Sequence, residues 1–599
     1  MVASARSGSG PMVASAGSGS APMVASARSG SGPTSPTRPT LRGSFGMSAS
    51  THWLATASAQ SVLERGGTAV DAAVAGAFVL QVVEPHLNGP GGDLVALVAP
   101  RGRDPMVVCG QGAAPAGATR ERFAGFDSVP GAGALAAAVP GATATWLWLL
   151  AEHGSWELGD VLEYAIHYAD HGFPALPRLR ATVAAVEGLF REHWPSSAEL
   201  WLQDGDTYTN PDWARTLRLL RDAGGSDRAS RIEAARRVWQ EGEVAEAMAA
   251  TSARPHRHSD GRDHAGVLTV ADVAGFRPST EEPLTVDFRG TTVAKAGAWS
   301  QGPVLLHALA MLDTFPAARL DPSTVEGAHT VLEVLKLALA DREGFYGDGA
   351  DVRHLLDASR AALVGERAAD YRVRAGGFTP PLRVEGEDDP AVGTGEPTVE
   401  SSGRTCGDTC HLDVVDRWGT MVAATPSGGW LQSSPTVPGY GFCLGTRLQM
   451  TWLDPASPAR LEPGRRPRTT LSPTLLLRGG EAVAALGTPG GDQQDQWQLL
   501  YLLRTLVLGM TPQEAIDAPA LHTTAMPGSF WPRTWTPRGI VGESRLGPVL
   551  DGLAARGHAV TVAPPWSLGR LSVVTRDPAT GELGAAANPR GAQGYAAGR

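Results

Sequence analysis

Residues 405–424 read TCGDTCHLDVVDRWGTMVAA, and the prediction of the fold starts from this stretch. Residues 412–415 and 421–424 are short apolar runs around a polar turn that contains Gly419, a pattern typical of a β-hairpin. The chain before them, about residues 376–408, is rich in Pro, Gly, Glu and Thr and poor in apolar residues, which predicts a mobile linker. A linker therefore runs directly into the first strand of a new sheet, with Thr409 at the junction.

A threonine at such a junction has a possible chemical role. If the chain were cut before Thr409, this residue would carry a free α-amino group, whose ordinary pKa is about 7.7–8.0. That amine could take the proton of the residue's own hydroxyl, so that one residue is both nucleophile and base. Any threonine before a strand has the same spacing, and a cut one residue later would instead expose Cys410.

The flanking sequence predicts helical layers around hairpins. Helical spacing relates Val70, Ala73, Val74, Ala77 and Phe78, which predicts a helix that ends before Pro85. An earlier helix is expected from a cap at Ser50 and Thr51 to Arg65. A second hairpin is expected at residues 472–486, before an apolar helix at 494–507, and residues 146–312 are mostly helical in pattern. The fold class is therefore predicted to be α/β (α+β), a sandwich with a largely helical portion in the first part of the chain.

The N-terminal residues have a different character. Residues 1–33 consist of three copies of the eleven-residue unit M-V-A-S-A-x-S-G-S-x-P. Such units are too short and too rich in Ser, Gly, Ala and Pro to form a packed repeat. We therefore predict a disordered tail over residues 1–38.

Composition excludes several classes of protein. The 599 residues carry a formal charge of −10, with 42% hydrophobic and 19% charged residues, which is a globular composition with an acidic balance. No nucleic-acid partner and no membrane partner are expected from this charge and from the short apolar stretches. The lysines, Lys295 and Lys336, are each followed by an apolar residue, which excludes a phosphate-binding P-loop. A cytoplasmic protein is the resulting expectation.

The sequence contains two clusters of residues that could bind a metal ion, and neither is predicted to be a metal site. His256, His258 and His264 lie in a polar stretch that suits a solvated loop better than an ordered metal site. Cys406 and Cys410, with the adjacent His411, have too few neighbouring ligands for a closed zinc site. No metal and no cofactor are predicted.

Several motifs occur in a fixed order along the chain, and together they resemble the γ-glutamyltranspeptidase family of the N-terminal-nucleophile hydrolase superfamily. They are Gly66-Gly67-Thr68-Ala69-Val70-Asp71-Ala72-Ala73, Val83-Glu84-Pro85-His86 with Gly91-Gly92, Thr409-Cys410-His411 with Val414-Val415-Asp416 and Gly419, Arg468-Thr469-Thr470-Leu471-Ser472-Pro473-Thr474, Gly487-Thr488-Pro489-Gly490-Gly491, and Ala587-Asn588-Pro589-Arg590. The resemblance covers about residues 43–590.

The resemblance implies a four-layer αββα sandwich and a precursor that cleaves itself between Asp408 and Thr409. Residues 39–408 would form a large subunit and residues 409–599 a small subunit, and the two would stay together. Thr409 would be the nucleophile. Gly490 and Gly491 would donate backbone N–H groups to the oxyanion, or alternatively form only a tight turn. Thr425 and Ser427 align with family hydroxyls that hold the nucleophile, unless they are ordinary strand-end hydroxyls.

The sequence departs from the family at the residues that grip a γ-glutamyl group. Gln111 stands where the family has the arginine that binds the α-carboxylate, and Thr451 stands where it has an aspartate for the α-ammonium group. Gly429 aligns with a family asparagine, and Thr469 and Thr470 with paired serines. Neutral groups cannot replace these charge pairs, so this glutamyl-binding clamp is predicted to be altered.

Three functions follow from these observations. The first is an autoprocessed hydrolase or acyltransferase that acts on an amide substrate, with γ-glutamyl transfer as the family default. The second is a carbon–carbon bond hydrolase in specialised metabolism, as in antibiotic biosynthesis, because some members of the family cleave such a bond on the way to alkylated proline units. The third is a non-catalytic binding protein on the same fold.

Overall fold

The predicted hairpin is present in the computed structural model as β13 (Leu412–Asp416) and β14 (Met421–Ser427), paired antiparallel. The structure describes residues 36–384, 409–590 and 594–599. Within them, residues 37–599 belong to one compact unit. The predicted tail lies outside the described residues except at 36–38, and the predicted linker lies outside them except at 376–384.

The hairpin is at the centre of a seven-stranded sheet. Strand β13 pairs on its other side with β2, and β14 pairs with β3. The strand order is β23 (Tyr595–Gly598), β2 (Gly46–Ser50), β13, β14, β3 (Asp93–Ala99), β4 (Met106–Cys109) and β9 (Ser279–Glu281).

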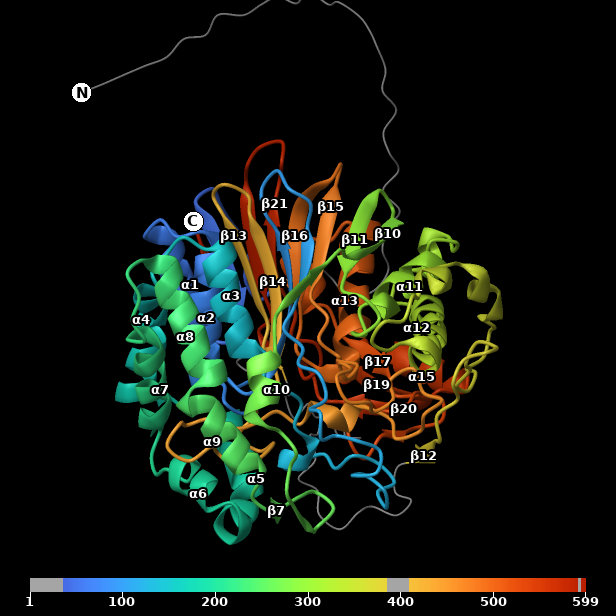
Figure 1. Cartoon of the computed structure of the whole chain (residues 1–599). Helices are drawn as coiled ribbons and strands as arrows, with labels where there is room; N and C mark the ends of the chain where they lie inside the picture. The colour runs from blue at the N-terminus through green and yellow to red at the C-terminus, as the bar shows by residue number, and fades with distance from the viewer. Residues whose placement is uncertain (1–35, 385–408, 591–593) are drawn as a thin grey trace, which may run out of the picture. The chain divides into compact units, whose positions relative to one another are not determined.

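A second seven-stranded sheet packs against the first (Figure 1). The core between them is apolar, with Val415 and Met421 from the first sheet meeting Leu475, Ala485 and Val574 from the second. Its order is β1 (Leu41–Gly43), β22 (Leu583–Ala587), β21 (Ser572–Arg576), β16 (Glu481–Gly487), β15 (Thr474–Arg478), β11 (Thr291–Lys295) and β10 (Leu284–Phe288).

Helices cover the outer face of each sheet, which completes the predicted four-layer αββα sandwich (Figure 1). On the first sheet lie α1 (Trp53–Glu64) and α2 (Ala69–Val83), and with them α3 (Ala142–His153), α4 (Leu158–His171), α5 (Pro177–His193), α6 (Pro195–Trp201), α7 (Pro211–Arg221), α8 (Arg228–Glu241), α9 (Glu243–Ser252) and α10 (Val270–Gly275). On the second lie α11 (Pro303–Leu312), α12 (Val325–Phe345), α13 (Gln494–Leu502), α14 (Pro512–Asp517) and α15 (Pro548–Ala555), with a small sheet of β17 (Leu521–Thr523), β19 (Gly539–Glu543) and β20 (Ala559–Ala563).

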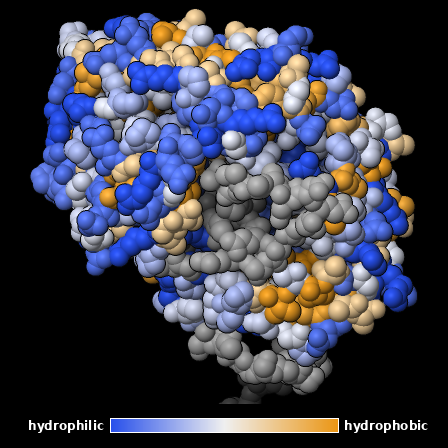
Figure 2. All heavy atoms as spheres, turned by 90° about the horizontal axis from the view of Figure 1, so that it is seen from below, coloured by the Kyte–Doolittle hydropathy of each residue, from blue (hydrophilic) through white to orange (hydrophobic). Residues whose placement is uncertain are grey.

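Short two-strand ribbons complete the described structure. They pair β5 (Phe173–Pro174) with β6 (Thr207–Tyr208), β7 (His256–Arg257) with β8 (Asp263–His264), and β12 (Arg383–Val384) with β18 (Thr534–Trp535). On the face shown in Figure 2 the described surface is mostly hydrophilic, with hydrophobic side chains in separate patches. Among the described residues, no helix combines the length and the apolar character needed to cross a membrane.

One expectation about local structure was wrong in detail. Ser50 ends strand β2, and His52 caps helix α1 by accepting the N–H of Leu54 through its side chain. Residues 146–312 are mostly helical, as expected, and they also contain strands β9, β10 and β11. Burial alternates along β10, but that strand has only five residues.

The contacts of Asp71 show a structural role for the aspartate of the motif at residues 66–73. Its carboxylate completes a capping box with Thr68 at the start of α2. It also accepts the N–H groups of Ser155 and Trp156, at 2.7 and 3.0 Å, and the hydroxyl of Ser155. One buried carboxylate thus fixes the start of α2 to the loop after α3.

We expect Asp71→Ala to lower the free energy of unfolding by about 2–4 kcal/mol, because it removes a helix cap and leaves several N–H groups without their acceptor. A fall in the midpoint of thermal unfolding measures this. Asp160→Ala, which removes an exposed acid from the first turn of α4, is the matched control and should change the stability by less than about 1 kcal/mol. Equal midpoints for the two variants would contradict this role.

Candidate active site

Thr409 lies at the end of the first sheet, buried to 1% exposure and paired with Ser427 through an antiparallel bridge. Its Oγ1 is 3.4 Å from Ser427 Oγ, longer than an ordinary bond between hydroxyls. The N–H of Cys410 donates to Pro426 O at 3.1 Å and continues the ladder. Thr409 is thus held by its backbone rather than by its side chain. Asp408, the other half of the predicted cleavage site, lies outside the described residues.

A buried chain of polar side chains lies beside Thr409 on the same face of the sheet. His411 Nδ1 is 2.8 Å from Thr425 Oγ1, and His411 Nε2 is 2.8 Å from Asp413 Oδ1. Ser572 donates to the second oxygen of Asp413 at 2.7 Å. Thr425, predicted to hold the nucleophile, contacts His411 instead of Thr409, so its effect on Thr409 is indirect.

Sequence reasoning missed His411, Asp413 and Ser572 as parts of the site. A signal for two of them was available, because side chains at alternate positions of a strand point to the same face. Thr409, His411 and Asp413 follow this spacing. Burial raises the pKa of Asp413, although His411 and Ser572 oppose this shift. No sequence pattern connects Ser572 with Thr409, His411 and Asp413, because Ser572 belongs to strand β21 of the other sheet.

The turn after β16 approaches this chain closely. A Cβ atom built on Gly487 would lie 2.2 Å from Cε1 of His411, so only glycine leaves room for the imidazole. Gly490 has φ of 129°, and a Cβ there would lie 2.4 Å from the Trp497 ring. Gly487 and Gly490 therefore belong to a tightly packed turn.

The peptide groups of this turn are fixed by their carbonyls. Gly490 O accepts the N–H of Gln493 at 2.9 Å, and Gly491 O accepts Nε2 of Gln301 at 2.9 Å. In a trans peptide the N–H points away from the carbonyl of the preceding residue, so the bond to Gly490 O sets the direction of the Gly491 N–H. Preorganised N–H groups of this kind suit an oxyanion.

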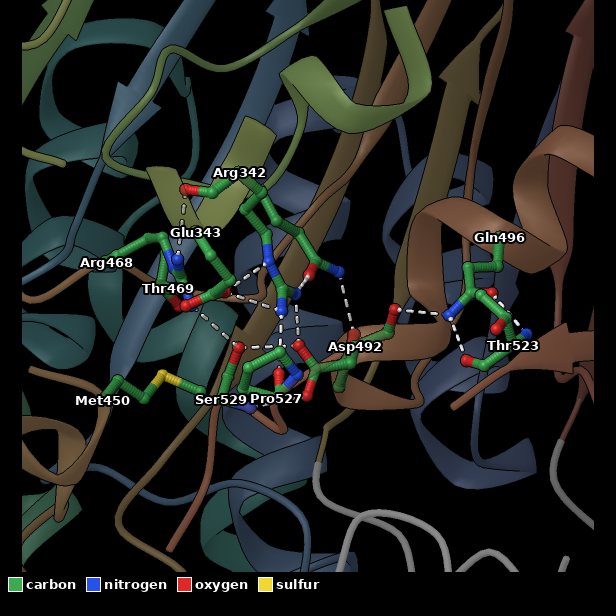
Figure 3. A network of polar contacts seen from close by, with 12 residues as sticks. Arg342, Glu343, Met450, Arg468, Thr469, Asp492, Gln496, Thr523, Pro527 and Ser529 are labelled. Carbon is green, nitrogen blue, oxygen red and sulfur yellow. Dashed lines mark hydrogen bonds and ion pairs between the residues drawn. The ribbon is translucent and has the colours of Figure 1, made fainter. Parts of the chain in front are cut away.

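A buried network of charges supports the turn from behind (Figure 3). Arg342 binds both Asp492, which directly follows Gly491, and Glu343. Ser529 donates its N–H and its hydroxyl to Asp492 at 2.8 and 2.6 Å, and Arg468 binds Glu343 at 2.7 Å. Burial raises the pKa of Asp492, but Arg342 and Ser529 outweigh this effect and hold the pKa below its ordinary value.

The glycine-rich segment 88–93 packs on the chain that follows Ser427. The N–H of Gly89 donates to Gly428 O at 2.8 Å, and a Cβ on Gly92 would lie 2.1 Å from Ser427 O. Gly429, predicted as a binding residue, has φ of 65° and lies against Gly92 N. Close backbone contact explains the glycines of this motif.

The predicted clamp residues lie at two places. Ser427 pairs with Asp93 on β3, and Gln111 follows β4 beside it, so Thr409 and Gln111 are three strands apart, about 14 Å in the sheet. Gln111 Oε1 is buried without a hydrogen-bond partner. Thr451 Oγ1 donates to Leu448 O at 2.7 Å and is occupied within its own turn.

Thr469 and Thr470 lie between the two sheets beside Trp299. The N–H of Thr469 donates to Trp299 O, and its side chain accepts the N–H of Leu471. Thr470 Oγ1 is buried without a hydrogen-bond partner among the described residues. Trp430 is fully buried against Met450 and Phe530.

The thiol of Cys410 lies on the opposite face of β13, among the core residues that pack on the helices. Its Sγ is 3.1 Å from Glu84 Oε2. Burial and the negative charge of Glu84 raise the pKa of this thiol well above its ordinary value. Such surroundings do not activate a thiolate nucleophile.

The histidine-rich stretch is more ordered than expected. His258 is buried, its Nε2 accepts the N–H of Leu135 and its Nδ1 contacts His256 O, so protein groups use both nitrogens. Among the described residues one group has the spacing of a metal site, namely His329, Glu333 and His558. Lys336 forms an ion pair with Glu333, and the two imidazoles bond to each other. Protein groups thus already contact these side chains, although His558 Nδ1 is buried without a hydrogen-bond partner among the described residues.

A four-layer αββα sandwich, with a threonine at the start of a central strand opposite a glycine turn, defines the class of N-terminal-nucleophile hydrolases. The sequence model of the family described as Gamma-glutamyltranspeptidase matches residues 55–598. The chain belongs to this family.

Known relatives agree with this assignment. The solved structure of LmbA2991HD is 51% identical, covers 94% of this chain and 100% of its own, and superposes with a TM-score of 0.88. The cephalosporin acylase from Bacillus halodurans is 27% identical over 95% of this chain and 98% of its own, with a TM-score of 0.77. The oxamate amidohydrolase proenzyme of Klebsiella pneumoniae is 30% identical over 92% of this chain and 98% of its own.

We expect Gly487→Ala to lower the rate of hydrolysis by about 10²-fold, because the new methyl group must displace the His411 ring. Turnover of a chromogenic amide by the purified variant measures this. Gly188→Ala, in helix α5 with open space around it, is the matched control and should keep the full rate. A fully active Gly487→Ala variant would show that the position of His411 does not matter.

Proposed function

We propose that the chain is an autoprocessed threonine N-terminal-nucleophile enzyme that acts through an acyl-enzyme on an amide. The observation that carries the proposal is the position of Thr409, which begins the hairpin ladder with its hydroxyl at Ser427. A cut before this residue would leave its new amino group at a fixed point of the sheet.

Processing would begin with attack of Thr409 Oγ1 on the carbonyl carbon of Asp408. The peptide C–N bond breaks, the nitrogen takes a proton, and an ester links the two residues. Water then hydrolyses the ester, which leaves the Asp408 carboxylate and a Thr409 that carries both a free hydroxyl and a free amine.

The same atoms would then act on a substrate. The Thr409 amine takes the proton of its hydroxyl, Oγ1 attacks the amide carbonyl, and the N–H groups of Gly490 and Gly491 bind the oxyanion. The protonated amine gives its proton to the departing nitrogen. Water releases the acyl group in a hydrolase, and an amine accepts it in a transferase.

The sheets explain how two subunits would remain associated after the cut. Strand β2 of the large subunit pairs with β13 of the small one, and β3 pairs with β14. In the second sheet β1 pairs with β22, and β11 with β15. These shared ladders support one intertwined domain made of residues 39–408 and 409–599.

Hydrolysis has more support than transfer. Two relatives are named for hydrolytic reactions, an amidohydrolase and an acylase. γ-Glutamyl transfer, the family default, needs charged partners where this chain has Gln111 and Thr451. We therefore propose an amide hydrolase with an altered glutamyl clamp.

We expect Thr409→Ala to stay as one polypeptide and to be inactive, since it lacks the attacking hydroxyl. Wild-type protein should separate into two chains on a denaturing gel. Thr409→Ser keeps a hydroxyl, so it should be cleaved, and mass spectrometry should place its new N-terminus at residue 409.

An active wild-type protein that is one unbroken chain would refute this mechanism. A cleaved protein that hydrolyses γ-glutamyl anilide efficiently would refute the loss of the clamp. A cleaved protein without activity on any amide would favour the carbon–carbon bond hydrolase. An uncleaved and inactive one would favour the binding protein.

A further inference from the structure

Arg533 is a buried guanidinium group that differs from its charged neighbours. Arg342, Arg447 and Arg468 each bind a carboxylate, from Asp492, Asp93 and Glu343 respectively. Arg533 is 5% exposed, and no ion pair joins it to a carboxylate among the described residues.

The hydrogen bonds of Arg533 use one nitrogen of the guanidinium group and leave the other two nitrogens without a partner among the described residues. Nη2 donates to the carbonyl oxygens of Gln449 and Thr451, which accounts for both of its hydrogens. The planar group lies over the Trp452 ring, with Cζ 4.0 Å from the ring centre. Nε and Nη1 are buried and have no hydrogen-bond partner in the described structure. Three N–H bonds of a fixed cation are therefore available.

Arg533 also lies at the right place for a substrate contact. The segment 529–533 touches the glycine turn at one end, where Ser529 binds Asp492. At the other end Arg533 touches Thr451, the residue that replaces the clamp aspartate. The segment thus spans the distance between the predicted oxyanion donors and the predicted acyl-binding residues.

The surrounding charges do not neutralise this cation. Burial lowers the pKa of Arg533 to about 9, and the positive charge of Arg468 acts in the same direction, although Glu343 opposes it. A buried cation with free N–H groups is costly until an anion binds to it. A carboxylate is the anion that a guanidinium group binds best in such surroundings.

We propose that Arg533 binds a carboxylate group of the acyl donor and takes over the role of the arginine that Gln111 replaces. This inference rests on the proposed amide hydrolase function and specifies its substrate class. The substrate would be an amide whose acyl part bears a carboxylate. The chain has Thr451 and Trp452 rather than a carboxylate at the clamp segment, so the acyl part needs no ammonium group.

Two anilides of the same length test this proposal. Glutaryl p-nitroanilide ends in a carboxylate, and valeryl p-nitroanilide ends in a methyl group. The wild-type protein should prefer the glutaryl compound. Arg533→Met should lose about 30-fold or more in kcat/KM on the glutaryl compound, mainly through KM, and change little on the valeryl compound.

Two further variants distinguish the effect of the charge of Arg533 from an effect on the fold. Arg533→Lys keeps a cation with donors for the two carbonyls and should retain part of the preference, which also covers the case that Arg533→Met fails to fold. Arg538→Met removes an exposed arginine five residues away and should behave as wild type. Equal losses on both anilides, or a wild-type protein without any preference, would overturn the proposal.

Binding of glutarate tests the role of Arg533 even if the protein does not hydrolyse amides. If the processed wild-type protein hydrolyses neither anilide, calorimetry with glutarate still tests Arg533. Binding to the wild-type protein that is lost in Arg533→Met supports the carboxylate site. No binding to the wild-type protein, or the same affinity in both proteins, overturns it.

Discussion

The register between β13 and β14 is the constraint on which the rest of the site depends. The Thr409–Ser427 bridge places Thr409, His411 and Asp413 between the two sheets, and Cys410 and Leu412 against the helices. A shift by one residue would exchange these faces and bury the thiol where the hydroxyl now lies. Strand β2 pairs with β13 from the other side and reinforces the register, so the chain before and after the proposed cut fixes it together.

Close backbone packing is the second requirement, and it explains why glycine occupies so many positions near Thr409. The segment 88–93 touches residues 427–429 backbone to backbone, and Gly487 leaves the space that His411 fills. At these contacts the segments approach each other closely because glycine has no side chain to separate them. Because the densely packed turn has few alternative conformations, its N–H groups would not need to reorganise if they bind a substrate oxyanion, as proposed.

The sequence predicted the hairpin and helix α2, because alternation and helical periodicity are local and strong there. The four-layer architecture was implied by the resemblance to the family. The sequence also named Thr409, Ser427 and the glycine turn through ordered motifs. It did not find Ser572 or Arg533, since each reaches the site through contacts between distant segments. The motifs also predict that Thr425 holds the nucleophile, whereas its hydroxyl contacts His411 in the structure.

The distribution of buried charge gives a physical account of how one fold changes its substrate. In the interior, Lys295 binds Asp495, Arg447 binds Asp93 and Arg590 binds Glu543, so these charges stabilise the protein without a ligand. A group that is buried with unused N–H bonds stores an unfavourable energy instead, and a ligand of opposite charge releases it. In the proposed site, replacing the charged clamp by Gln111 and Thr451 would remove one such centre, while Arg533 would supply another from the C-terminal part of the chain. The position of a single guanidinium group would then determine which substrate is bound, while the hairpin and the glycine turn stay the same.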